Sequence, residues 1–314
     1  MNALGSRGRL VWRRLFRHQQ WNIGIVDRPI HTFLGTEGHP EIRWFPLKGR
    51  DAFLADPFGR VDEAGATILC EHYDYRGARG TIRRIRVENG RFVSPLEPAL
   101  ELPTHLSYPF LVEEDGVVYC LPEARAHREI ALFRATSFPT SWTQEPALVA
   151  DVVAVDPTLV SHGGRWWLMC VDGEGEENAD LLVWHAPALR GPWVAHRANP
   201  VKSDAGSARP AGTPFEHEGR LYRPAQDCSD TYGARIVINE VTRLTPEDYA
   251  EEQVAVIEPS ADSPYPAGRH TLSALGDMTL IDGHRFVFVG VALRQFVGIL
   301  ARDLLRRLRD VGPR

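Results

Sequence analysis

The segment Phe53–Phe58, FLADPF, returns in altered form four more times along the chain. The later copies are LSYPFL at 106–111, VDPTLV at 155–160, ARPAG at 208–212 and HTLS at 270–273. Their leading residues lie 52, 48, 53 and 61 positions apart, and they are Asp56, Tyr108, Asp156, Arg209 and His270. A proline follows the first four. Short runs rich in β-branched and aromatic residues, broken by Gly, Pro, Asn and Asp, fill each interval and predict several antiparallel strands.

Repeats of this length with about four strands each are typical of β-propeller blades. The sequence therefore predicts an all-β fold, a five-bladed β-propeller with a short C-terminal helix. The fifth unit lacks an outer strand, and residues 21–30, WNIGIVDRPI, have the strand character to supply it and close the ring. A β-sandwich of similar strand content is the alternative, but it gives no reason for an X-Pro start to recur. The predicted parts are a basic segment at 1–20, the propeller at 21–293 and a basic amphipathic helix at 294–314.

Charge is distributed unevenly along the 314 residues, whose formal net charge is −5. Residues 1–20 carry five arginines and no acid, and residues 294–314 carry six arginines and two aspartates, which leaves −14 on the body between them. An acidic body argues against nucleic acid as a partner. Basic amphipathic ends suit an anionic membrane surface; the alternative is that the C-terminal helix packs its apolar stripe on the propeller.

The chain has no run of eighteen apolar residues and no evident signal-peptide core, so we expect a cytoplasmic protein, peripheral at the inner membrane face if its basic ends bind lipid. Its four cysteines, at 70, 120, 170 and 228, fall at matching places in successive units, and no CxxC pair occurs. We predict that they are reduced and buried on second strands, with no zinc site.

Polar residues recur at fixed places within the repeat. The first strand of a blade lines the central channel, and the second strand returns to the same mouth some fifteen residues later. Gathering carboxylates in this way costs desolvation and mutual repulsion. Proteins usually tolerate that cost only at a functional site. Together with nearby aromatic residues these carboxylates favour a funnel that binds a sugar or glycan, lined by Asp56, Glu71, Tyr108, Glu123, Asp156, Asp172, Arg209, Gln226, Asp227 and His270.

Each of these residues also has a structural interpretation. An Asp-Pro at a strand start is a common turn signal. Glu71 and Glu123 can form ion pairs with nearby arginines, Arg83, Arg84 or Arg125, and a single histidine such as His270 is often only a satisfied core residue.

With these motifs, the chain resembles the five-bladed glycosidase propellers of the arabinanase, xylosidase and invertase type. The resemblance implies that Asp56 is a base or nucleophile and that Asp156 orients the acid. It also implies that His270 holds a central Ca or Na ion through water. Arg209 stands where the arabinanase type has its acidic Glu, so Glu123 or Glu71 would have to supply the proton.

From about Trp21 to Val291 the chain is similar to the N-terminal domain of plant glucosamine inositolphosphorylceramide transferase and its stand-alone bacterial relatives. FLADPF, HLSYPFL, ARPAG, YRPAQDCS and HTLS carry this match. It implies a carbohydrate-active propeller in polysaccharide or glycolipid metabolism, glycosidase-like or sugar-transferring. The alternative is a non-catalytic glycan-binding or scaffold propeller that works with a glycosyltransferase partner. In both cases Tyr108, Asp172, Arg209, Gln226, Asp227 and His270 are the expected sugar-binding residues.

Overall fold

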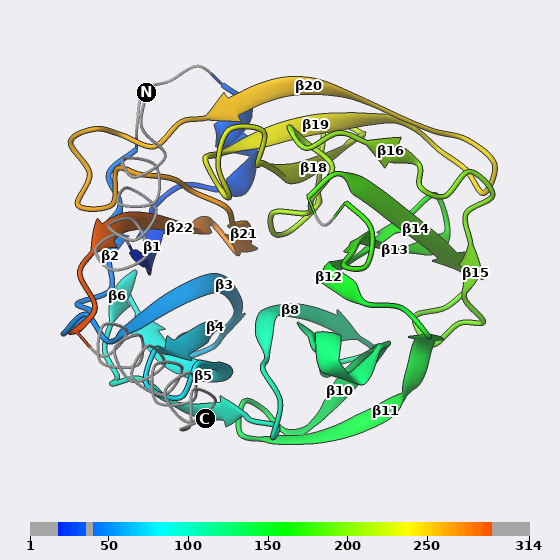
Figure 1. Cartoon of the computed structure of the whole chain (residues 1–314). Coiled ribbons are helices and arrows are strands. Elements are labelled where there is room, and N and C mark those ends of the chain that lie inside the picture. The colour runs from blue at the N-terminus through cyan, green and yellow to red at the C-terminus, as the bar shows by residue number, and fades with distance from the viewer. Residues whose placement is uncertain (1–17, 36–39, 177, 291–314) are drawn as a thin grey trace, which may run out of the picture.

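Five antiparallel sheets stand in a ring around a central axis in the computed structural model, which describes residues 18–35, 40–176 and 178–290 (Figure 1). The predicted five-bladed propeller is confirmed. Its first blade consists of β3 (Ala52–Asp62), β4 (Gly65–Asp74), β5 (Arg79–Glu88), β6 (Arg91–Phe92) and β7 (Glu97–Leu100). The second consists of β8 (Ser107–Glu114), β9 (Val117–Glu123), β10 (Glu129–Ser137) and β11 (Ser141–Ala150).

The third and fourth blades follow in chain order. The third contains β12 (Ala154–His162), β13 (Arg165–Asp172), β14 (Asp180–Ala186), β15 (Val194–Ala195) and β16 (Lys202–Ser203). The fourth contains β17 (Phe215–His217), β18 (Arg220–Asp227), β19 (Arg235–Leu244) and β20 (Tyr249–Ile257).

The two ends of the described chain build the fifth blade together. β21 (Leu272–Leu275) and β22 (Met278–Val287) pair with β1 (His18–Val26), which is followed at the outer edge by β2 (Arg43–Trp44). The prediction that the N-terminal strand closes the ring is therefore confirmed, although the strand is third in the blade and ends at Val26. Residues Ile30–Leu34 form a 3-10 helix, η1, and a second one, η2, spans Arg125–His127.

The X-Pro starts of the first three blades are β-bulges. The pairing register shifts between Ala55 and Phe58 in β3, and at the equivalent places in β8 and β12. In each bulge the residue before proline has a positive φ: 51° at Asp56, 45° at Tyr108 and 52° at Asp156. Proline is tolerated here because the innermost strand is a sheet edge and needs no donor on that side. Bulges re-aim side chains, and strained non-glycine residues gather at functional sites.

The core lies between neighbouring blades. One apolar cluster joins blade two to blade three through residues such as Phe110, Leu132 and Leu168, and another joins blade five to blade one. Burial of this kind supplies about 25 cal/mol per Å² of apolar surface and fixes the blades that carry the polar residues of the channel.

All four cysteines are free. Cys70, Cys120 and Cys170 are buried on second strands as predicted. Cys228 differs, because β18 ends at Asp227 and this thiol lies in the following turn, where it is partly exposed.

Two predictions fall on parts of the chain that are not described. The C-terminal helix at 294–314 and nearly all of the basic segment at 1–20 lie outside the described residues; β1 includes the last three residues of that segment. Among the residues described, no helix is long and apolar enough to cross a membrane.

Candidate functional site

A cavity of about 320 Å³ opens on the channel at the level of the X-Pro bulges. Blades one to four each contribute polar side chains to it. The residues that line it are Asp56, Glu71, His105, Ser107, Glu123, Arg125, Asp156, Arg209 and Tyr232. The structure thus places five of the ten sequence-derived candidates around one cavity: Asp56, Glu71, Glu123, Asp156 and Arg209.

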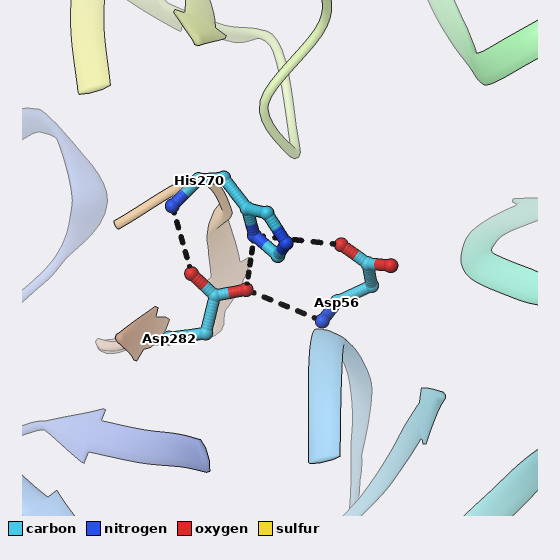
Figure 2. Close-up of side chains that lie close together, drawn as sticks. All are labelled: Asp56, His270 and Asp282. Carbon is cyan, nitrogen blue, oxygen red and sulfur yellow. Dashed lines mark hydrogen bonds and ion pairs between the residues drawn. The ribbon is translucent and has the colours of Figure 1, made fainter. Parts of the chain in front are cut away.

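Asp56 is fixed by a buried cluster in which blade five meets blade one (Figure 2). The His270 Nδ1 atom lies 2.6 Å from Asp282 Oδ2 and 3.7 Å from Asp56 Oδ1. The other Asp282 oxygen accepts the backbone N–H groups of His270 and Thr271, at 2.9 and 3.0 Å. Asp56 accepts the Thr271 hydroxyl on Oδ1 at 2.8 Å and the Tyr108 N–H on Oδ2 at 3.3 Å. Both oxygens of Asp56 are therefore acceptors, as in an ionised carboxylate.

The electrostatics of this cluster follow from burial and pairing. Burial raises the pKa of Asp56, and the nearby His270 partly offsets that rise. Burial alone would lower the pKa of His270, but the charges of Asp282 and Asp56 outweigh it and raise that pKa. Burial likewise opposes ionisation of Asp282, yet His270 and the two backbone donors lower its pKa. Trp21 stacks on the His270 ring, with centroids 3.7 Å apart, and favours the imidazolium by cation–π attraction.

A metal ion does not fit this cluster well, although the ligand atoms of Asp56, His270 and Asp282 lie within 4.8 Å of one another. Ca²⁺ prefers six to eight oxygen ligands, whereas the set offers two carboxylates and an imidazole. The His270 Nδ1 atom is already in contact with Asp282 at 2.6 Å, so it is not open to an ion. Asp282 and Asp56 raise the pKa of His270, which favours a positive charge on the ring between the two carboxylates, and no step is assigned to a metal.

A chain of hydrogen bonds joins blades two, three and four on the other side of the cavity. Glu123 accepts the Arg125 Nε–H on Oε1 at 2.8 Å and the Asp156 N–H on Oε2 at 2.9 Å. Asp156 Oδ2 in turn accepts the Arg209 Nε–H at 2.6 Å and the Gln226 side-chain amide at 2.7 Å. Burial raises the pKa of Asp156 to about 7, although the charge of Arg209 opposes the rise.

Arg209 is buried and held on several sides. Its Nη1 donates to the Asn178 side-chain oxygen at 2.9 Å, and its guanidinium lies over the Tyr232 ring at 4.9 Å. Arg209 therefore anchors Asp156.

Glu71 has a different environment from the other three carboxyls of the cavity. His105 contacts its carboxyl group, with Nε2 at 3.5 Å from Oε1. The His105 Nδ1 atom accepts the Gly80 N–H at 2.8 Å, so the proton of the neutral ring is on Nε2 and faces Glu71. Burial first, and then the charge of Asp56, raise the pKa of Glu71 well above its usual range. This environment favours the protonated form of Glu71.

Gln226 and His270 lie behind the cavity wall and act through residues that line it. Gln226 supports Asp156, and His270 supports Asp56. The Tyr108 ring is buried, and its hydroxyl accepts the Gly212 N–H at 2.7 Å and shares a hydrogen bond with Thr158 at 2.9 Å. Tyr108 therefore joins blades two, three and four.

Asp172 and Asp227 do not line the cavity. Ala55 pairs with Glu71 and Ser107 pairs with Glu123, but Val155 pairs with Val171, one residue before Asp172. A shift of one residue turns a side chain to the other face of the strand. Asp172 accepts the Glu174 N–H instead. Asp227 accepts from Ser229 and forms an ion pair with Arg235 at 2.7 Å.

The sequence pattern did not single out Asp282, the most buried carboxylate of the site. It ends the run MTLID on the second strand of the fifth unit, twelve residues after His270, so the repeat contained the signal. His105 and Ser107 precede the Tyr108-Pro109 bulge and had no polar pattern to mark them. The sequence suggests only an ion-pair role for Arg125, and Tyr232 is simply one of the aromatic residues near the predicted funnel.

These features define a class of protein: a five-bladed β-propeller with a buried, carboxylate-rich cavity at the mouth of its channel. The chain belongs to the family described as "Glucosamine inositolphosphorylceramide transferase 1, N-terminal", which it matches over residues 48–265. It is 38% identical over 208 residues to glucosamine inositolphosphorylceramide transferase 1 of Oryza sativa subsp. japonica, and 34% identical to that of Arabidopsis thaliana. The matched region is 64% of this chain but only 28% and 27% of those relatives.

Solved structures share the fold at low sequence identity. A family 117 glycoside hydrolase from Zobellia galactanivorans superposes with a TM-score of 0.53 and 14% identity, covering 86% of this chain and 91% of that one. A glycosyl hydrolase from Bacteroides ovatus gives a TM-score of 0.56 with 8% identity, covering 74% and 87%. The resemblance to glycosidase propellers is thus confirmed at the level of fold.

Proposed function

We propose that the protein is a carbohydrate-active enzyme that cleaves or transfers a glycosidic bond in the funnel. The observation that supports this most is the contrast between two carboxyl groups of the same cavity. Burial and neighbouring carboxylates raise the pKa of Glu71 well above its usual range, whereas at Asp56 the charge of His270 and the Thr271 hydroxyl oppose the rise. Carboxyl groups whose environments separate their protonation states are the acid and base of glycosidase chemistry.

Each residue has a distinct part in this proposal. Glu71 donates its proton to the glycosidic oxygen as the bond breaks, and it takes the place of the acid that the glycosidase propellers carry on blade four. Asp56, held by His270 and Thr271, acts as base toward water or an acceptor hydroxyl, or as nucleophile. Asp156 is locked by Arg209 and Gln226 and positions the sugar.

The substrate class follows from the relatives. Their name states transfer of glucosamine to inositolphosphorylceramide, and we therefore propose an amino sugar glycoside or a glycolipid headgroup as the ligand of the cavity. We further propose that the protein acts in the cytoplasm, and that its basic terminal segments bring it to the inner membrane face.

The test uses glycosides that differ only in their leaving group. A dinitrophenyl glycoside needs no proton to depart, whereas a methyl glycoside does. The panel starts with glucosaminides and includes hexosides and pentosides. Glu71→Gln should keep activity on the dinitrophenyl compound and lose at least about 100-fold on the methyl compound, while Asp56→Asn should lose both. Asp172→Asn, at the end of the second strand of blade three but outside the cavity, is the matched control and should behave as wild type. Equal losses on both substrates for Glu71→Gln would refute its role as the acid.

A second candidate function is a glycan-binding module that works beside a glycosyltransferase. The buried Arg209–Asp156 ion pair favours it, because an arginine occupies the position of the blade-four acid. Saturation-transfer NMR with the same sugars distinguishes the two functions. Binding that depends on Asp156 and Arg209, with no turnover of any glycoside, would support the binding module.

A further inference from the structure

A second cavity, of about 310 Å³, lies outside the funnel against blade five. It lies between the outer strand β2 and the loop that connects β20 to β21. Apolar and polar side chains share its walls, including Ile42, Trp44, Ser260, Asp262, Ser263 and Arg269. The funnel residues do not take part in it.

Arg269 is the unusual member of this cavity. Its side chain is only 1% exposed, yet its Nε and Nη1 atoms are buried without a hydrogen-bond partner. Burial lowers the pKa of Arg269 to about 10, so the guanidinium is still charged at neutral pH. A buried cation with open N–H groups is expensive unless something pairs with it. Asp282 attracts it, but no ion pair between the two is formed within 4.0 Å among the residues described.

The rest of the cavity suits the body of a small organic molecule. Trp44 occupies space left by two glycines, since a Cβ at Gly283 would come within 2.9 Å of the indole and one at Gly24 within 3.2 Å. The ring also contacts Tyr265, with centroids 4.7 Å apart. Ser260 and Ser263 offer hydroxyls, and Asp262 is exposed at the rim, where its carboxylate can accept hydroxyl groups.

Asn22 adds a second open polar atom beside Trp44. It is fully buried, and its amide donates to the Phe45 carbonyl at 2.8 Å and to the Tyr265 hydroxyl at 2.9 Å, while its Oδ1 has no partner. Asn22 is not among the residues that line the cavity, so its open oxygen shows only that hydrogen bonding in this part of blade five is incomplete.

We propose that this cavity is a second ligand site, which binds the phosphate or carboxylate group of a small hydroxylated molecule through Arg269. The anion pairs with the charge of Arg269, which lines the cavity, and the apolar face of the ligand lies on Trp44. Guanidinium groups match such anions in both charge and geometry. The site is independent of the chemistry proposed for the funnel.

In the experiment, the full chain is titrated with inorganic phosphate, glucose 1-phosphate, glucuronate and glucose. Binding is measured by calorimetry and by the shift in melting temperature. We expect saturable binding of the anionic compounds, tighter for glucose 1-phosphate than for phosphate, and none of glucose. Arg269→Met should weaken binding at least about tenfold. It should leave the unliganded melting temperature equal or higher, because it removes an unpaired buried charge. If phosphate binds more tightly than glucuronate, the anionic group of the ligand is a phosphate; the reverse preference identifies a carboxylate.

Two further variants keep the test specific. Arg243→Gln removes an exposed arginine from blade four and should bind as wild type. Asp56→Asn alters the funnel and should also leave this binding unchanged. The proposal is overturned if no anion binds saturably, if Arg269→Met binds as well as wild type, or if Asp56→Asn abolishes the signal.

Discussion

Replacement of Asp282 by Asn tests the buried cluster that holds Asp56 in place. Asp282 is fully buried and accepts four contacts: from the His270 ring, the His270 and Thr271 amides, and the Asp56 amide at 3.3 Å. Removing one partner of a buried ion pair costs about 3–5 kcal/mol. The side-chain oxygen of Asn can still accept hydrogen bonds from the two backbone amides. We therefore expect the lower end of this range, a loss of about 3 kcal/mol in the free energy of unfolding.

The loss should depend on pH in a defined direction. His270 has a raised pKa in the folded protein, so its contribution is complete below its unfolded value of 6.5 and declines as the pH rises through the raised value. Asp282 has a lowered pKa, so its contribution is complete above its unfolded value of 3.8 and declines as the pH falls through the lowered value. The difference between wild type and Asp282→Asn is therefore largest from about pH 4 to 6.5 and shrinks in alkaline solution.

Urea unfolding followed by tryptophan fluorescence at pH 5.5 and pH 9 measures this difference. Asp277→Asn, an exposed substitution in the same β21–β22 hairpin, is the control and should change stability by less than about 0.5 kcal/mol. A loss below about 1 kcal/mol, or one equal at the two pH values, would refute the ion-paired cluster.

Three other predictions concern separate features. Burial raises the pKa of Glu71, so wild-type stability should fall as the pH rises above about 4.5; Glu71→Gln should make that fall smaller, with Asp56 and Asp156 supplying the remainder, and should be more stable than wild type at pH 8, which urea unfolding at several pH values checks. Four thiols should react with Ellman's reagent in denatured, unreduced protein, and Cys228 should react before the three buried ones in native protein; two or fewer would reveal a disulfide. Binding to anionic liposomes in flotation should weaken with salt and disappear when residues 1–17 and 291–314 are removed; equal flotation of the shortened chain would count against membrane contact.

The fold was predictable because its strongest signal is local. An X-Pro at an edge-strand bulge needs an unusual backbone, and Asp56, Tyr108 and Asp156 repeat it at blade spacing. That spacing also identified the strands that bring Glu71 and Glu123 back to the same mouth. The face of the strand to which a side chain points is harder to predict, because a shift of one residue reverses it. Asp172 is an example.

The remaining details of the site depend on contacts between blades. The sequence alone does not show that Asp282 joins His270 to Asp56 across the closing blade, or that His105 turns its Nε2–H toward Glu71. Those contacts bring together residues as far apart as 56 and 282. They follow from how five blades close the ring, and only the assembled propeller shows them.

The most direct test of the central claim is a crystal structure of the protein soaked with the glycosides of the panel. A sugar should lie in the funnel cavity within hydrogen-bond distance of Asp56 and Asp156, with its glycosidic oxygen next to Glu71. Soaks of Asp56→Asn crystals should show it weakened or absent. If every sugar of the panel leaves the funnel empty, or if the sugars bind only elsewhere on the propeller, the assignment of this cavity as a carbohydrate site is wrong.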